Sequence, residues 1–296
     1  MLEPFRSFSM DIKLAQNEYG ELRVRLFRVT HRGGLHEVKD LTVAARFEGS
    51  FGAAYMAGDN RAILPPDTIK NTVYVLARQY PAEAIEDFAF HIVDHFLTYN
   101  PQVSRLNLDV TERPWSRIPI GEKGHASAFV GNAGERRAAR ISATREKITL
   151  ESGIEDLHLL KTAGASFENF LRDPYTTLES RAQTVFPTGL CAHWSYEFPE
   201  PEMPFSTMWH GIRKTLLETF AAHESKSPQH MLYALGHAVL DNFEAIVEIR
   251  LSISEGYCVL VDLKPFGMEN ENEVFAPAAE PRAIVSATLR RNGNLV

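Results

Sequence analysis

The sequence predicts an α+β protein in which antiparallel sheets carry helices on one face. Apolar residues alternate with polar ones in several segments, as in half-buried strands, and they recur at helical spacing in two pairs of segments. The order strand, strand, helix, helix, strand, strand occurs twice along the chain. The length of 296 residues fits two units of about 150 residues each. We therefore expect a structural repeat, inferred from the order of elements rather than from residue-level similarity.

The first half begins with a predicted β-hairpin over residues 18–57. Leu22, Val24 and Leu26 give near-alternation, and the Gly33-Gly34 pair favours a turn. Helical spacing follows from Asp67 to about residue 79, and Pro81 is expected to start a second helix that ends near residue 99. Strands are then predicted at 103–119, 125–133 and 137–150.

The second half repeats this order. Strands are predicted at 156–163 and 184–197, helices at 205–223 and 227–242, and two closing strands at 244–254 and 257–264. We divide the chain into an N-terminal extension (1–17), a first repeat (18–150), a second repeat (151–290) and a tail (291–296).

Composition narrows the classes of partner. A net charge of -7 disfavours nucleic acid, so the cluster of Arg136, Arg137 and Arg140 is interpreted as a solvated turn and strand edge. No window approaches the ~20 apolar residues that a membrane-spanning helix needs, and no secretory signal is visible, so we expect a cytoplasmic protein without a membrane partner. The sequence has only two cysteines, Cys191 and Cys258, which lie far apart and lack CxxC spacing, and this excludes a thiolate zinc site.

Neither a metal nor an organic cofactor is expected. His91 and His95 have a spacing that could hold a metal on one helix face, but HExxH is missing, and a structural or interface role is favoured. The sequence contains no GxSxG, GxGxxG or phosphate-binding loop, so flavin and nicotinamide lack support.

The segment Pro65-Pro66-Asp67 is typical of a helix start. The prolines restrict the entering backbone, Asp67 can cap exposed amides, and Ile69 and Val73 begin an apolar stripe.

Five stretches give this chain a specific resemblance. They are Tyr19-Gly20 with Val24-Arg25, Asp59-Asn60, Asp67 to Thr72, Phe170 to Asp173 with Tyr175 to Leu178, and Glu273 to Pro277. In them the chain resembles the urate oxidase (uricase) family, from about Tyr19 to Arg290. The resemblance implies two tandem tunnelling-fold repeats and a homotetramer in which sheets close a barrel around a tunnel. It also implies active sites at subunit interfaces and cofactor-independent chemistry with molecular oxygen as co-substrate.

Several substrate-binding positions of the family are retained. The resemblance makes Phe167 the plate on which a purine stacks, Leu178 the apolar wall beside it, and Gln229, directly after Pro228, the reader of the purine edge. It makes Asp67 the partner of a proton-shuttling threonine supplied by a neighbouring subunit.

Other family positions are changed. Pro66 replaces the threonine of the shuttle, Glu21 its lysine and Thr184 the arginine that clamps urate. Glu255 falls at the family's asparagine and Tyr257 at its histidine, in a turn whose sequence differs from that of the family.

The exchanges indicate altered chemistry. Thr184 cannot give the bidentate contacts of arginine, and Pro66 has neither a hydroxyl nor an amide hydrogen. Glu21 and Glu255 make the pocket more acidic, which disfavours an anion and favours a neutral or protonated ring. Structural interpretations compete: Glu21 could be a solvated strand residue, Glu255 a turn residue, Tyr257 an interface aromatic, Phe167 a core residue and Gln229 a helix-start residue.

We therefore predict an oxidase or oxygenase acting on a planar nitrogen heterocycle, such as a purine or pterin, rather than on urate. Glu21, Asp67, Glu255 and Tyr257 would handle protons. Three alternatives stay open: a hydrolase, cyclohydrolase or lyase on a similar heterocycle; a urate oxidase with a rearranged site, producing 5-hydroxyisourate and hydrogen peroxide; and a non-catalytic binding protein.

Overall fold

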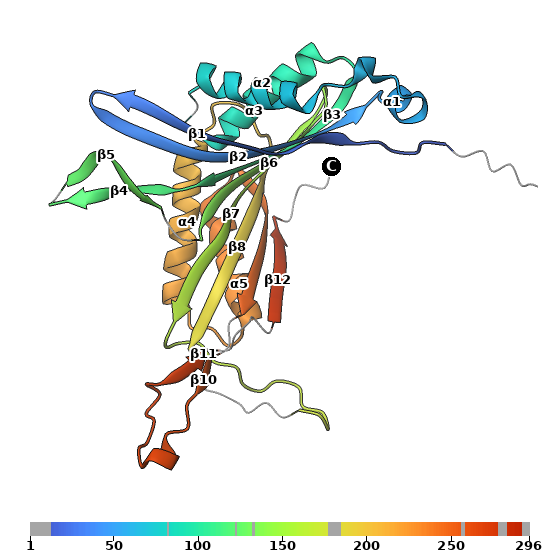
Figure 1. The fold of residues 1–296 in the computed structure, drawn as a ribbon. Helices are drawn as coiled ribbons and strands as arrows, with labels where there is room; N and C mark the ends of the chain where they lie inside the picture. The colour runs from blue at the N-terminus through green and yellow to red at the C-terminus, as the bar shows by residue number, and fades with distance from the viewer. Residues whose placement is uncertain are drawn as a thin grey trace, which may run out of the picture.

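An eight-stranded antiparallel sheet organises the computed structural model, with the strand order β1-β2-β3-β6-β7-β8-β9-β12 (Figure 1). The structure describes residues 13–81, 83–121, 123–131, 134–176, 185–255, 258–277 and 283–291. The strands of this sheet are β1 (Tyr19–Arg32), β2 (Leu35–Gly49), β3 (Val103–Arg113), β6 (Arg136–Ala143), β7 (Ile148–Lys161), β8 (Phe186–Tyr196), β9 (Ile246–Glu255) and β12 (Ala283–Arg290).

Four longer helices pack on the sheet. They are α2 (Pro66–Gln79), α3 (Ile85–Tyr99), α4 (Phe205–Ala222) and α5 (Pro228–Asn242), and a short helix, α1 (Gly52–Ala57), follows β2. The pair α2 and α3 covers the first four strands, while α4 and α5 cover the last four (Figure 1). The α+β class with antiparallel strands and helices on one face is therefore confirmed.

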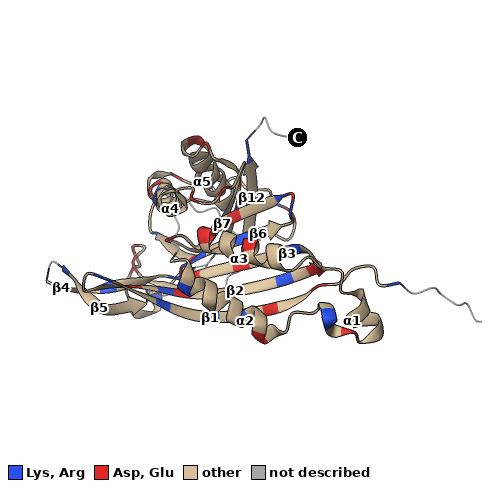
Figure 2. Cartoon of the chain, turned by 90° about the horizontal axis from the view of Figure 1, so that it is seen from above, with Lys and Arg blue, Asp and Glu red and all other residues tan. Residues whose placement is uncertain are grey.

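The apolar core lies between the helices and one face of the sheet. Along β8, every second residue from Phe186 to Tyr196 is buried, and in β3 Leu106, Leu108 and Val110 are buried while the residues between them are partly exposed. This alternation follows from the pleat of a strand, which sends successive side chains to opposite faces. The other face is polar, and Figure 2 shows positive and negative residues interspersed on neighbouring strands.

Two hairpins project from the main sheet. One consists of β4 (Trp115–Ile120) and β5 (Lys123–Gly131), and the other of β10 (Cys258–Leu260) and β11 (Phe275–Pro277). Short 3₁₀ turns occur at η1 (Asn60–Ala62) and η2 (Lys264–Phe266). Among the described residues, no helix is long and apolar enough to cross a membrane.

The predicted N-terminal hairpin is confirmed for β1 and β2, with Gly33 and Gly34 at φ of 54° and 84° in the turn between them. Its predicted extension to residue 57 is wrong, because β2 ends at Gly49 and residues 52–57 form α1. The prediction that Pro81 starts the second helix is wrong, because Ala84 is extended and α3 begins at Ile85. The predicted strand at 137–150 is two strands, separated by a turn in which the Thr144 amide donates to the Lys147 carbonyl at 2.8 Å.

The predicted closing strand at 257–264 is also wrong. Only β10 forms there, and it pairs with β11 in the small hairpin. On the side of β9 away from β8, the pairing strand is β12, with Ala283 opposite Glu255. The predicted boundary between residues 150 and 151 falls inside β7, and the division into two domains stays a prediction.

The interpretation of the arginine cluster as a solvated strand edge is contradicted. β6 pairs with β3 on one side and with β7 on the other, so it lies in the interior of the sheet. Arg137 is buried and ion-paired with Glu86 at 2.5 Å, and Arg136 and Arg140 pair with acidic residues of β7.

Candidate functional site

The first group of predicted site residues lies at the start of α2. Pro65 is the N-cap residue with φ -58° and ψ 144°, and Pro66 is the first helical residue, where a missing amide hydrogen costs no intrahelical bond. The expectation that Asp67 caps the helix is wrong. Its carboxylate instead accepts from Lys70 Nζ at 2.5 Å and from Asn71 Nδ2 at 3.0 Å.

Lys70 sets the electrostatics of this group. Its hydrogen bond and positive charge lower the pKa of Asp67, and Asp67 in turn raises the pKa of Lys70, with a smaller contribution from Glu21. An Asp67 that stays ionised can accept a proton or a hydrogen bond but is a poor acid near neutral pH. Sequence reasoning missed Lys70, although its i,i+3 spacing from Asp67 is a recognisable ion-pair signal.

Glu21 lies in β1 next to an irregularity in its pairing with β2, between Glu21 and Val24. Its side chain is partly exposed, and its carboxylate accepts from the amide of Arg23 at 3.3 Å. The strand that contains Glu21, β1, packs against α2, and Glu21 makes the last of the contributions that raise the pKa of Lys70.

The second group contains Phe167 and Gln229, which lie in segments joined by backbone pairing. Ala165 and Ser225 form an isolated parallel bridge, in which the Ser225 amide donates to Gly164 and the Ser166 amide donates to Ser225, both at 2.9 Å. Phe167 directly follows this bridge. The helix α5 begins shortly after Ser225, and Gln229 is its second residue.

Ser227 and Pro228 fix the start of α5. The Ser227 hydroxyl is the N-cap acceptor and takes a hydrogen bond from the His230 amide at 3.1 Å. Pro228 is the first residue of the helix and has no amide hydrogen, so it contributes shape rather than a hydrogen bond. Gln229 is exposed, and its amide group is therefore accessible to a ligand.

Phe167 belongs to a column of planar groups. Its ring stacks on Phe170 with centroids 5.0 Å apart and an interplanar angle of 11°, and the Arg172 guanidinium lies 4.8 Å from the Phe170 centroid. Phe167 is partly exposed rather than a core residue, so the interpretation of simple core packing is wrong. Phe170 covers one face of the Phe167 ring, and a planar ligand would stack on the opposite face.

Three predicted residues, Leu178, Thr184 and Tyr257, lie outside the described residues. Glu255 is the last residue of β9, and its backbone lies opposite Thr188 and Ala283. Its side chain also lies outside the described part of the structure.

The two groups of site residues lie on separate parts of one chain. Figure 1 shows α2 above the sheet at one end of the molecule, whereas the segment that follows β7 extends beyond the opposite end of β7 and β8, beside β10 and β11. The structure thus packs the strand of Glu21 against the helix of Asp67 and joins the segments of Phe167 and Gln229, but it does not bring these two groups together within one chain.

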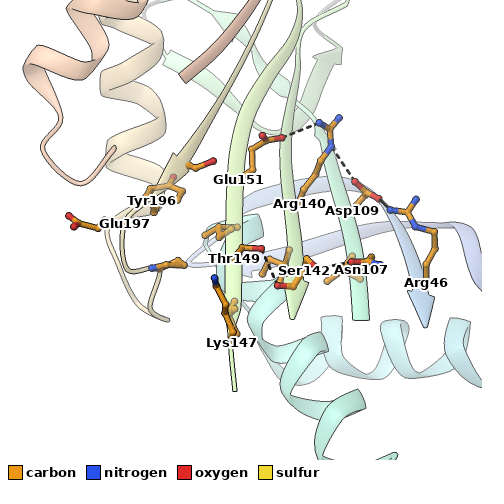
Figure 3. Close-up of a pocket in the computed structure, with 16 residues that line it drawn as sticks. Arg46, Asn107, Asp109, Arg140, Ser142, Lys147, Thr149, Glu151, Tyr196 and Glu197 are labelled. Atoms are coloured by element: carbon orange, nitrogen blue, oxygen red, sulfur yellow. Dashed lines mark hydrogen bonds and ion pairs between the residues drawn. The ribbon is translucent and has the colours of Figure 1, made fainter. Parts of the chain in front are cut away.

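The polar face of the sheet contains a hollow of about 520 Å³ that is separate from both groups (Figure 3). A ladder of ion pairs crosses it: Arg46 to Asp109 at 2.9 Å, Asp109 to Arg140 at 3.2 Å, and Arg140 to Glu151 at 3.1 Å. Because the residues of this ladder are ion-paired with one another, they leave no unbalanced charge that would attract a ligand to the hollow.

The described residues contain no group of three or more His, Cys, Asp or Glu side chains that could hold a metal ion. His91 stacks on Tyr80 with ring centroids 4.0 Å apart, and His95 lies against Phe96 and Tyr99. These packing contacts agree with the structural role expected for both histidines.

Comparison with known proteins adds the family. The model of the Uricase family matches residues 17–142 and 150–286. A uricase of Arthrobacter globiformis is 36% identical over 283 residues, which cover 96% of this chain and 91% of the relative. The chain belongs to the uricase family. A uricase of Oryctolagus cuniculus is 30% identical over 287 residues and covers 95% of each chain.

Solved uricases share the fold. The crystal structure of the Arthrobacter globiformis uricase gives a TM-score of 0.90 at 35% identity and covers 97% of this chain and 98% of that one. A urate oxidase from Bacillus sp. TB-90 gives a TM-score of 0.81 at 21% identity, a similarity that concerns the fold alone. The predicted tunnelling fold is confirmed, and this member of the uricase family is a urate-oxidase-like oxidoreductase.

Proposed function

We propose that this protein is a cofactor-independent oxidase in which a planar nitrogen heterocycle gives two electrons to O₂, yielding hydrogen peroxide. The observation that carries the proposal is the arrangement of Phe167 and Gln229, whose segments are joined by the Ala165–Ser225 bridge. A flat ring can stack on the face of Phe167 opposite Phe170 while the amide of Gln229 pairs with its edge. Electron-rich heterocycles can donate electrons to oxygen themselves, so the protein's task is orientation and proton transfer.

We further propose that a second copy of the chain completes each site, as in the homotetramer implied by the family. The separation of α2 from the Phe167 segment within one chain supports this arrangement (Figure 1). In the complete site, Asp67 and Lys70 of one subunit would face the heterocycle held by its neighbour, and Glu21 would lie behind them. Glu255 and Tyr257 stay candidates for proton transfer on the heterocycle's own subunit.

The charge of this site favours a neutral or protonated heterocycle over the urate anion. Glu21 and Asp67 bring two carboxylates against the one ammonium group of Lys70, and Pro66 supplies no hydrogen-bond donor. Carboxylates near a binding site disfavour anionic ligands. Urate is the competing candidate, and the names of the relatives, which are uricases matched over nearly the whole chain, favour it.

Substrate loss measured by liquid chromatography in air separates these candidates. The panel contains urate, a neutral purine and a pterin, and the wild type is compared with the triple variant Glu21→Lys, Pro66→Thr and Thr184→Arg. We expect the wild type to convert a neutral ring faster than urate and the triple variant to gain activity on urate. A wild type that converts urate faster than every other ring would establish the urate candidate, and binding without conversion of any ring would overturn the oxidase proposal.

A further inference from the structure

The start of α5 contains a pair of histidines beside the residue proposed to read the heterocycle. His223 ends α4 as its C-cap residue, and His230 is the third residue of α5, one position after Gln229. His223 Nε2 lies 3.3 Å from His230 Nδ1, and the ring centroids are 4.4 Å apart. Neither histidine has a role in the chemistry proposed above.

The hydrogen bonds fix which ring nitrogens carry protons. The Lys226 amide lies 3.3 Å from His230 Nδ1, and since an amide can only donate, Nδ1 must be the acceptor. His223 Nε2 must then carry the hydrogen that it shares with the same Nδ1 atom. His230 is therefore neutral in this arrangement, and its one ring proton sits on Nε2.

His230 also completes the cap of α5. Its amide donates to the Ser227 hydroxyl at 3.1 Å, while its ring accepts from the amide of Lys226, the residue before the N-cap. This reciprocal pattern resembles a capping box, in which the third helical residue is usually Glu or Gln. A ring acceptor differs from those side chains in one respect: an imidazole nitrogen that takes up a proton becomes a donor and can no longer accept.

The cap is tied to the Phe167 segment. The Ser225 hydroxyl donates to the Ser227 carbonyl at 2.7 Å, and Ser225 is the residue that forms the backbone bridge to Ala165. Order at the cap therefore extends from Gln229 on α5 to the residue that precedes Ser166 and Phe167.

We propose that the His223–His230 pair is a pH-sensitive clamp that positions Gln229 and the Phe167 segment only while Nδ1 of His230 is free of a proton and can accept hydrogen bonds. A second proton on His230 must bind Nδ1, and this removes the acceptor for both the Lys226 amide and His223. The inference rests on the proposed role of Gln229 and Phe167 in binding a heterocycle, and it adds a positioning function for His230.

Burial and the surrounding charges oppose protonation of His223. The ammonium group of Lys161, in β7, donates hydrogen bonds to the carbonyls of Phe220, Ala221 and His223. This places its positive charge next to the His223–His230 pair. Lys226 adds a second cation in the connecting loop, and Glu224 of that loop is the nearby carboxylate, packed beside Gly164 and exposed to solvent. Burial, followed by His230 and Lys161, lowers the pKa of His223.

The direction of the pH effect follows from these groups. His223, whose pKa is lowered on folding, binds fewer protons in the folded state than in the unfolded state, so the structure around it loses stability as pH falls below about 6.5. This loss of stability is complete once the pH lies below the lowered pKa of His223. The clamp is therefore closed at pH 7.5 and opens under mildly acidic conditions.

Hydrogen–deuterium exchange of peptides covering residues 223–232 tests the clamp without a substrate. The protein is compared at pH 5.5 and 7.5, with exchange corrected for its intrinsic pH dependence. In the wild type, protection at pH 5.5 should fall about fivefold, the factor that corresponds to one ordinary hydrogen bond. His230→Asn places a carbonyl oxygen near Nδ1 that cannot take up a proton, so it should be protected equally at both pH values.

Two further variants make the outcome decisive. His230→Leu has no acceptor and should lack protection at both pH values, while His237→Asn, two turns later on α5, should behave like the wild type. A His230→Asn protein that loses protection at pH 5.5 as the wild type does would overturn the clamp. For the heterocycle that the protein converts fastest, KM of the wild type should rise when the pH is lowered from 7.5 to 5.5. KM of His230→Asn should not change over this range. Normal exchange behaviour without any heterocycle turnover would refute the oxidase proposal alone.

Discussion

Replacing Glu86 by alanine is expected to destabilise the protein strongly, because this buried carboxylate joins the two halves of the sheet. Glu86 of α3 is 0% exposed and pairs with Arg137 of β6, Nη2 to Oε2, at 2.5 Å. Its other oxygen accepts from the Ser152 hydroxyl of β7 at 2.6 Å, and Ser152 accepts from the Tyr196 hydroxyl at 3.0 Å. The network thus connects α3 to strands of both halves.

The expected magnitude follows from the partner that the substitution leaves behind. The Arg137 side chain is 7% exposed, and its Nε has no hydrogen-bond partner in the described structure, so Glu86 provides its compensating charge. Removing one member of a buried ion pair costs about 3–5 kcal/mol. Glu86→Gln retains an acceptor for Ser152 and should cost less, about 1.5–3 kcal/mol, the value of a hydrogen bond to a charged group.

Urea unfolding at a fixed protein concentration measures the effect, followed by the fluorescence of Trp194 and Trp209. The fixed concentration matters because dissociation of an oligomer would add to the apparent stability. Glu218→Ala is the matched control, since Glu218 is 68% exposed and pairs with Lys214 at 3.7 Å on the surface of α4, where an ion pair contributes less than about 1 kcal/mol. A Glu86→Ala variant no less stable than this control would refute the reasoning.

Other positions give sharper tests of single features. The hydrogen bond from His193 is the main cause that lowers the pKa of Glu155 to about 2, so this carboxylate contributes stability above pH 4.5 that is lost as pH falls towards 2. Glu155→Gln should therefore lower the urea midpoint at pH 7 but leave it nearly unchanged at pH 2, and an equal loss at both would contradict this. Lys161→Met removes the ammonium group that binds three carbonyls at the end of α4, and it should cost roughly 1–3 kcal/mol in urea unfolding; no loss would show that these contacts are not stabilising. Phe167→Ala should raise KM for the heterocycle roughly tenfold, as expected for loss of an aromatic stack, whereas the exposed Phe266→Ala should not. Equal KM values for these two variants would exclude Phe167 as the stacking plate.

Local patterns in the sequence are sufficient to predict much of the fold. The hairpin of β1 and β2 follows from alternation and from two glycines that adopt positive φ. β12 was missed because the chain leaves the sheet after β9 to form the β10–β11 hairpin, while the prediction took 257–264 as the closing strand. The register of β6 was also readable, since Arg137, Ala139 and Ile141 share a buried face while Arg136 and Arg140 lie on the other.

The candidate site could be predicted only in part. The resemblance identified Asp67, Phe167 and Gln229, but spacing along the chain could not show that Phe167 and Gln229 share one support, because the bridge between Ala165 and Ser225 joins distant segments. The partner of Asp67 was available from helical spacing. That the strand of Glu21 packs against α2 could be seen only from the structure, because it depends on how β1 and α2 lie on each other.

Oxygen consumption tests the central claim most directly. An oxygen electrode records uptake by metal-free, dialysed protein while chromatography records loss of the heterocycle that it converts fastest. The proposed oxidase should consume one O₂ for each ring converted, release hydrogen peroxide in the same amount, and stop when oxygen is removed. Conversion that continues at the same rate under strict anaerobiosis would contradict the account and would instead establish a hydrolase or lyase.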